Sequence, residues 1–366
     1  MDLMTSSTSF ADVKKKYGDF TAPTIRIEVD GTEITEKLGA GISAVTVDLT
    51  AGFAASGCSF DVMGEYDRPN SKFDAKGVMD KLQLGAKIEV LLGYIKTESV
   101  FYGLVAEVEY VFDMEDAPYI HVECVDAKCL LMKTQRLDIA LDQKVSQSVT
   151  DILSAQPASA YLKGKEIDNL SKQEDMLPTS MESDYQFVVR QARYYGCEFF
   201  IVQGKAYFRK APASASAIMT LAPRKGIRTA RLSLRGGSLI KKAKVVGINP
   251  ENDEAISGEA TIQGNFSKGS TADRMMGEST KTFFEHDVVT AGEAKERATA
   301  IVKQAQSGFG RLLCSCVGLP ELVPGRSVKI TGLMPEADVT CYILEVRHTL
   351  DHRGFETTFE ARVDKL

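Results

Sequence analysis

Two short stretches of this sequence have the form of known chemical motifs. Residues 39–44, GAGISA, match the GxGxxA fingerprint, in which a strand leads into the glycines and a helix N-terminus beyond them receives the phosphates of a dinucleotide. Here the following residues, 45–49, alternate like a strand, so a turn is the better interpretation. Residues 238–241, SLIK, match SxxK, but they precede a predicted strand without a companion SDN or KTG motif. We interpret that match as chance.

The side chains that ligate metals or act as nucleophiles are dispersed along the chain. His348 shares a predicted strand face with apolar residues, which indicates a core or rim histidine. Neither His348 nor His352 has a Cys or carboxylate nearby in metal-ligand spacing, and His121 and His286 stand alone. The seven cysteines include no CxxC pair, and Cys314 and Cys316 share a strand face as small core residues do. These patterns assign no catalytic, cofactor-binding or metal site.

The bulk composition is that of a soluble globular protein. At 366 residues, with 44% hydrophobic and 26% charged residues, the chain is long enough for two or three domains. The net charge of −6 argues against a dedicated binder of nucleic acid or anionic membrane. No apolar run is long enough to span a bilayer, and residues 1–20 have no secretory-signal pattern. An odd number of cysteines fits reduced thiols.

Hydrophobic periodicity divides the chain into β-rich ends and a mixed middle. Alternating patterns favour strands from residue 24 to about 135 and again from 229 to 363. Two capping boxes, which begin at Ser183 and Thr290, predict helices there. The predicted fold class is α+β, mainly β. The predicted units are a tail that is flexible unless a partner holds it (1–20), a first β-barrel-like domain (21–135), an α+β middle domain with its linker (136–217) and a second β-barrel-like domain (218–366).

One turn-and-strand pattern occurs twice. Residues 82–93, LQLGAKIEVLLG, match residues 322–332, LVPGRSVKITG, at an offset of 240 residues. The repeat indicates an internal duplication and two similar β domains. It predicts that Gly85 and Gly325 each accept φ > 0 in a turn that leads into a strand. It also predicts that Tyr102 and Tyr342, separated by the same offset, occupy equivalent barrel positions on the same face.

Several segments, taken in order, resemble a known family. Residues 180–208, SMESDYQFVVRQARYYGCEFFIVQGKAYF, resemble the helix-hairpin signature of phage late-control protein D, the baseplate hub family of contractile tails, which is similar to the N-terminal part of type VI secretion spike proteins. Residues 243–260 resemble the family strand and turn that open the second barrel. FYGLVAEVEY (101–110) is similar to the first barrel. Three later segments resemble the C-terminal core of the family in order and spacing: 286–304, 318–332 and 341–363.

This resemblance implies a structural protein with no enzyme activity and no cofactor, located in the baseplate of a virion or injection particle and assembled in the bacterial cytoplasm. It implies a homotrimer whose six barrels join a sixfold tail tube to a trimeric spike, expected here as a separate polypeptide, alongside other baseplate proteins. The acidic balance suggests a neutral to negative lumen through which DNA slides without sticking. The alternatives are a tail-associated cell-wall hydrolase and a ligand-binding β-barrel protein.

Overall fold

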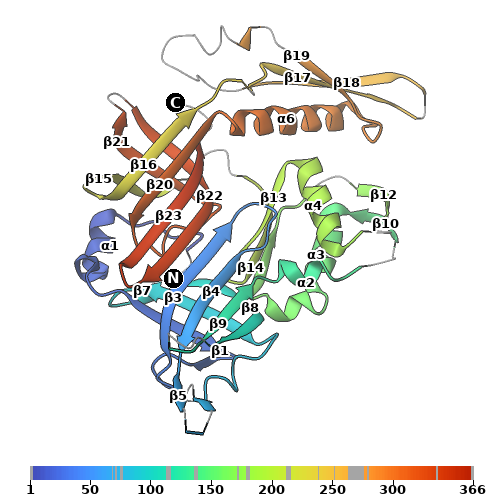
Figure 1. Cartoon of the computed structure of the whole chain (residues 1–366). Coiled ribbons are helices and arrows are strands. Elements are labelled where there is room, and N and C mark those ends of the chain that lie inside the picture. Colours follow the sequence, from blue (N-terminus) through green and yellow to red (C-terminus); the bar gives the residue numbers. More distant parts are fainter. Residues whose placement is uncertain are drawn as a thin grey trace.

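The computed structural model describes residues 3–363 except 68, 71, 75–76, 113–116, 136–138, 171–172, 179–181, 212–215, 238, 251, 263–275, 278–279 and 335–336. Strands predominate, and most of them belong to one sheet that passes through both ends of the chain. In Figure 1 the blue and cyan strands of the N-terminal half lie beside the orange and red strands of the C-terminal half, with the green middle part to one side. The predicted α+β, mainly β fold class is confirmed.

The first barrel-like unit is built from the N-terminal strands. Around the sheet their order is β2-β1-β7-β8-β9-β4-β3. The bounds are β1 Thr24–Val29, β2 Thr32–Glu33, β3 Gly41–Thr50, β4 Gly57–Met63, β7 Lys87–Gly93, β8 Thr97–Val111 and β9 Tyr119–Val125, and a small separate hairpin joins β5 Glu65–Asp67 to β6 Lys72–Asp74. Alternate residues of these strands are buried, so one face of each strand forms the core.

The second unit is a closed barrel of six strands. Its order is β22-β21-β15-β16-β20-β23, and β23 pairs back onto β22. The bounds are β15 Ala217–Pro223, β16 Gly226–Leu234, β20 Gly310–Val317, β21 Ser327–Met334, β22 Ala337–Asp351 and β23 Gly354–Val363. The β15–β16 pairing that completes the ring is short, from Ala222–Gly226 to Pro223–Ile227. Beyond Ile227, β16 pairs with β20 alone among the described residues.

Five strands of the two units correspond. In the first unit β7, β8, β9, β4 and β3 follow one another around the sheet, and in the second unit β21, β22, β23, β20 and β16 do the same, with every neighbouring pair antiparallel. The sixth strand differs, because β1 is antiparallel to β7 whereas β15 is parallel to β21. The predicted duplication therefore has structural support over five strands.

The turn glycines of the repeat are equivalent, as predicted. Gly85 has φ of 84° and Gly325 has φ of 80°, and each leads into a strand. The N–H of Gly85 donates to the Val105 carbonyl, and the N–H of Gly325 donates to the Ile343 carbonyl. Both glycines thus hold the same turn against the following strand.

The predicted equivalence of Tyr102 and Tyr342 is wrong by two residues. Lys87 lies opposite Leu104, and its counterpart Ser327 lies opposite Tyr342, so Leu104 is the true equivalent of Tyr342. The first hairpin is two residues longer than the second, because Val90 pairs with Phe101 whereas Ile330 pairs with Val339. A shift of two residues keeps the same face of the strand, since side chains alternate with a period of two.

The middle unit combines helices with short strands. Its elements are α2 Lys128–Leu131, β10 Ile139–Lys144, α3 Val145–Ser154, the 3-10 helix η2 Ala158–Tyr161, β11 Gly164–Ile167, β12 Gln173–Pro178, α4 Asp184–Tyr195, β13 Cys197–Val202 and β14 Lys205–Lys210. The helix predicted at Ser183 is confirmed: Ser183 caps the N–H of Gln186, the Gln186 side chain returns to the backbone of Ser183, and Gly196 ends the helix at φ of 64°.

An α+β excursion separates β16 from β20. It holds β17 Lys242–Ile248, β18 Ala255–Thr261, β19 Thr280–Phe284 and α6 Ala291–Ser307, and the three strands form their own sheet. The expectation that residues 243–260 open the second barrel is wrong, because β17 lies between β18 and β19 in a separate three-stranded sheet and pairs with both. The capping box at Thr290 is confirmed at the start of α6, which lies along this sheet at the top of Figure 1.

The N-terminal segment packs on the chain itself. It forms α1 Phe10–Lys16 and a 3-10 helix, η1 Gly18–Phe20, and buries Leu3, Val13 and Tyr17. The expectation of a flexible tail is wrong for these residues, because apolar side chains anchor them in the main core. The division of the rest of the chain into domains stays a prediction.

Candidate assembly interface

The two barrel units are joined edge to edge by β3 and β22. The second half of β22 runs antiparallel to β3, from the pair Glu345–Thr50 to the pair Leu350–Val45. The first half of β22 pairs with β21 instead, and a β-bulge at Leu344 lies at the change of partner. The Leu344 carbonyl accepts a hydrogen bond from the N–H of Ala51 at 2.8 Å. A bulge bends a strand, and here the bend carries β22 from one barrel to the other.

Most of one face of this junction is buried. Val346, His348 and Leu49 are each at most 3% exposed. The His348 Nδ1 atom lies 2.9 Å from Thr357 Oγ1 in the buried interior. Burial lowers the pKa of His348 to about 3, because a charged imidazolium would lose its hydration there. The sequence-based interpretation of His348 as a core histidine is confirmed.

The opposite face of the junction carries an ion pair. The Arg347 guanidinium donates from Nε to Asp48 Oδ1 at 2.6 Å and from Nη2 to Oδ2 at 3.0 Å. Both side chains are at least half exposed, so the pair fixes register more than it stabilises the fold. The partners are far apart in sequence, and spacing analysis had no signal with which to find them.

The middle unit contacts the second barrel through a charged aromatic cluster. The Tyr342 hydroxyl donates to Glu198 on β13, and the Arg362 guanidinium lies 4.4 Å from the Tyr342 ring centroid. Arg209 donates to the carbonyl of the turn residue Gly325 at 2.6 Å. The same turn that holds β22 in place is therefore also a docking point for the middle hairpin.

The N-terminal segment is held by buried polar groups. Glu321 is 1% exposed, and it accepts hydrogen bonds from the Tyr17 hydroxyl at 2.7 Å and from Lys16 Nζ at 2.9 Å. Lys16 also donates to Glu98 on β8 at 2.7 Å. Arg326 donates to the carbonyls of Leu3 and Ser6. This cluster ties the N-terminal segment to both barrel units.

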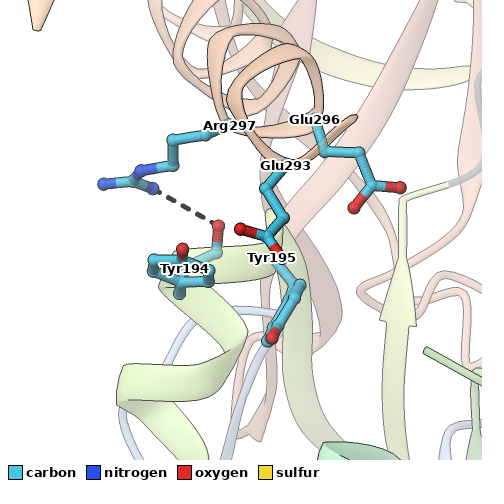
Figure 2. Close-up of a pocket in the computed structure, with 5 residues that line it drawn as sticks. All are labelled: Tyr194, Tyr195, Glu293, Glu296 and Arg297. Carbon is cyan, nitrogen blue, oxygen red and sulfur yellow. Dashed lines mark hydrogen bonds between the residues drawn. The ribbon is translucent and has the colours of Figure 1, made fainter. Parts of the chain in front are cut away.

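A shallow pocket lies where α4 meets α6, lined by Tyr194, Tyr195, Glu293, Glu296 and Arg297 (Figure 2). Arg297 donates to the Tyr194 carbonyl at 3.3 Å and pairs with Glu285 at 3.1 Å. Glu293 accepts from the N–H groups at the start of α6 as part of its capping box. Arg297 and Glu293 each serve a helix end, so the pocket is explained as a helix-helix contact.

The chemical motifs of the sequence lead to no site in the described residues. β3 begins at Gly41, inside the GxGxxA stretch, so these residues lead into a strand and no helix N-terminus is present there. Ser238 of the SxxK match lies outside the described residues. In the described part of the chain no group of three His, Cys, Asp or Glu side chains could hold a metal ion, and burial raises the pKa of Cys197 to about 12. No helix within the described ranges is both long and apolar enough to cross a membrane.

One family model matches the chain, and several solved structures share its fold. Residues 20–352 match the family model described as the Alg8 N-terminal domain. The structure is similar to the 43 kDa tail protein of prophage MuSo2 from Shewanella oneidensis, with a TM-score of 0.68 at 13% identity over 94% of this chain and 99% of that one. A tail protein from Neisseria meningitidis MC58 gives a TM-score of 0.68 at 14% identity, over 94% and 97% of the two chains.

A third similar structure comes from a secretion machine. An Escherichia coli component of the type VI secretion system gives a TM-score of 0.53 at 13% identity, over 92% of this chain and 76% of that one. None of the curated proteins matches. At these identities the structural likeness shows a shared fold, and the expected resemblance to phage tail and secretion spike proteins is confirmed at that level.

Proposed function

The chain belongs to the Alg8 N-terminal domain family, and from this premise we propose that it is the structural baseplate hub of a contractile phage tail or related injection particle. Three copies form a ring that joins a sixfold tail tube to a trimeric spike. The observation that carries the proposal is the presence in one chain of two barrel units with five equivalent strands, joined edge to edge by β3 and β22. Three such chains present six similar units in a ring, which matches sixfold and threefold neighbours at once.

The proposed partners are further copies of this chain, the tail tube protein, a spike protein and other baseplate proteins. The tail and secretion proteins that share the fold support this setting. The net charge of −6 is compatible with a lumen that lets DNA pass without binding. The proposed role of the hub is to join the tail tube to the spike, and we propose no enzymatic turnover.

The test is the molar mass of the purified chain by gel filtration with light scattering. The expected mass is three times that of one chain, with dissociation on dilution but no intermediate of two copies at high concentration. A monomer at every concentration contradicts the hub. Peptidoglycan or peptide hydrolysis that is lost on Cys197→Ala would contradict a purely structural role and favour the hydrolase.

A further inference from the structure

The strand pairing between the two units has an unused counterpart elsewhere on the chain. In the junction, the second half of β22 pairs with β3. The equivalent of β22 is β8 and the equivalent of β3 is β16. Beyond Val105, β8 pairs with β9 alone, and beyond Ile227, β16 pairs with β20 alone, among the residues that the structure describes. The first unit therefore exposes the β8 edge, which is equivalent to the edge of β22 in the junction. The second unit exposes the β16 edge, which is equivalent to the edge of β3.

The ladders give the equivalence residue by residue. β8 carries a bulge at Ala106 where β22 carries one at Leu344, and both lie just beyond the pairing with the preceding strand. From the bulges onward, 107–112 correspond to 345–350. Following the ladders through β9, β4, β23 and β20, residues 45–50 correspond to 230–235.

We propose that residues 107–112 of one copy pair antiparallel with residues 230–235 of a second copy, in the register that β22 and β3 use within the chain. The proposal rests on the proposed hub and names the surface by which its copies associate. Because the two edges are different surfaces, the contact is head-to-tail and generates a ring when the rotation between copies closes. Barrel units of the two kinds then alternate around that ring.

Apolar side chains meet apolar side chains in this register. Val108 lies opposite Leu234, Tyr110 opposite Leu232, and Phe112 opposite Ala230. Tyr110 is 48% exposed, Phe112 is 58% exposed and Leu234 is 45% exposed within one copy. Two of the counterparts in the internal junction, His348 and Leu49, are at most 3% exposed, and Leu350, the counterpart of Phe112, is half-buried. Association would bury this face in the same way that the junction does.

Charged side chains on the other face are complementary. Glu107 lies opposite Arg235, and Glu109 lies opposite Ser233 with Arg231 and Arg235 on either side. All four charged side chains belong to exposed residues. Within the chain, the corresponding face carries the Arg347–Asp48 ion pair. Acidic residues on β8 and basic residues on β16 select a second copy over a self-pairing of like edges, since like charges directly opposite repel.

A disulfide test reads the register directly. Residues directly opposite in an antiparallel pair have Cα atoms roughly 4.5–5.5 Å apart, which is within the range that a disulfide spans. We expect the double variant Glu109→Cys with Ser233→Cys to form covalent dimers and trimers on mild oxidation, visible on a non-reducing denaturing gel. Each single variant is the matched control, which accounts for the native cysteines. Monomers alone from the double variant, when light scattering shows it to be a trimer, overturn the pairing.

A charge exchange tests the same contact without new covalent bonds. Arg235→Glu should raise the dissociation constant of the trimer by about tenfold or more, because like charges then face each other across the edge. Glu107→Arg combined with Arg235→Glu should restore most of the affinity, while near-UV circular dichroism shows folded protein throughout. A wild-type monomer would contradict the hub itself. A wild-type trimer that is indifferent to both variants contradicts the strand pairing and leaves the hub standing.

Discussion

The two barrel units share the arrangement of five strands and differ in the sixth. Both place five strands in the same antiparallel order, but the second adds β15 parallel to β21 and closes, whereas the first adds β1 antiparallel to β7. The equivalent positions His348 and Tyr110 show the consequence. His348 is fully buried, with Thr357 and Phe355 of its own barrel and the paired strand β3 beside it, while Tyr110 is half exposed. Burial at the positions of His348 and Tyr110 therefore depends on the neighbouring strands more than on the residue type.

Acidifying the protein is expected to lower its free energy of unfolding more than the other changes below, because His348 is buried in the junction. The pKa of His348 is about 3 when folded and about 6.5 when unfolded, so between these values the unfolded state binds the extra proton. Stability is therefore fully present above pH 6.5 and is lost as pH falls, by about 1.4 kcal/mol per pH unit, reaching roughly 3 kcal/mol at pH 4. Urea unfolding from pH 7 to pH 4 measures the slope.

The matched control is His348→Gln, which removes the titrating group and keeps a polar side chain near Thr357. We expect a lower stability at pH 7 and a shallower loss toward pH 4 than in the wild type. Equal slopes for the two proteins would show that other groups account for the acid sensitivity.

The equivalent turn glycines Gly85 and Gly325 should differ in how much an Ala substitution destabilises the protein. Both have positive φ, so Ala at either position should cost about 1 kcal/mol or more in strain. A Cβ on Gly325 would also lie 2.6 Å from the Phe200 ring, whereas a Cβ on Gly85 would lie 3.7 Å from the Tyr161 hydroxyl. Gly325→Ala should therefore cost about 1–3 kcal/mol more than Gly85→Ala, as overpacking does. Chemical denaturation of the two variants measures the difference, and equal losses would contradict this account.

The capping boxes test the two helical units outside the barrels. Ser183→Ala and Thr290→Ala each remove a side chain that accepts an N–H at a helix start, and each should cost roughly 1 kcal/mol. Ser183→Asp and Thr290→Asp keep an acceptor and should retain most of the stability. Thermal unfolding of all four variants is the measurement. A loss in the Asp variants as large as in the Ala variants would show that capping is not the cause.

The ion pair of the internal junction has the smallest expected effect. Arg347→Met should cost about 0.5 kcal/mol, because both charges of the Arg347–Asp48 pair are largely exposed to solvent. The loss should shrink at 1 M salt, where screening weakens exposed pairs. A loss of several kcal/mol by denaturant unfolding would mean that the pair holds the two units together.

Local chemistry was readable from the sequence where neighbours in the chain determine it. Ser183 and Gln186 form a cap with each other, and Gly85 and Gly325 need positive φ whatever packs around them. The predicted equivalence of Tyr102 and Tyr342 failed because hairpin length, which sequence offset does not reveal, differs between the units.

Contacts between residues far apart in the chain could not be predicted from the sequence. The strand patterns in residues 243–260 are correct, but alternation does not say which sheet a strand joins, and these strands form a sheet of their own. Nothing local reports that Arg326 binds the carbonyls of Leu3 and Ser6, so the docked N-terminal segment was missed. The β3–β22 junction likewise joins opposite ends of the chain.

The central claim is that three chains alternate two similar units around one ring. Electron microscopy of the purified protein tests it most directly. The predicted result is a class average with six barrel-sized lobes, threefold symmetry and a central channel, in which 107–112 of each chain lies against 230–235 of the next. A particle in which the two units of different chains do not alternate, or in which those edges face solvent, would contradict the account.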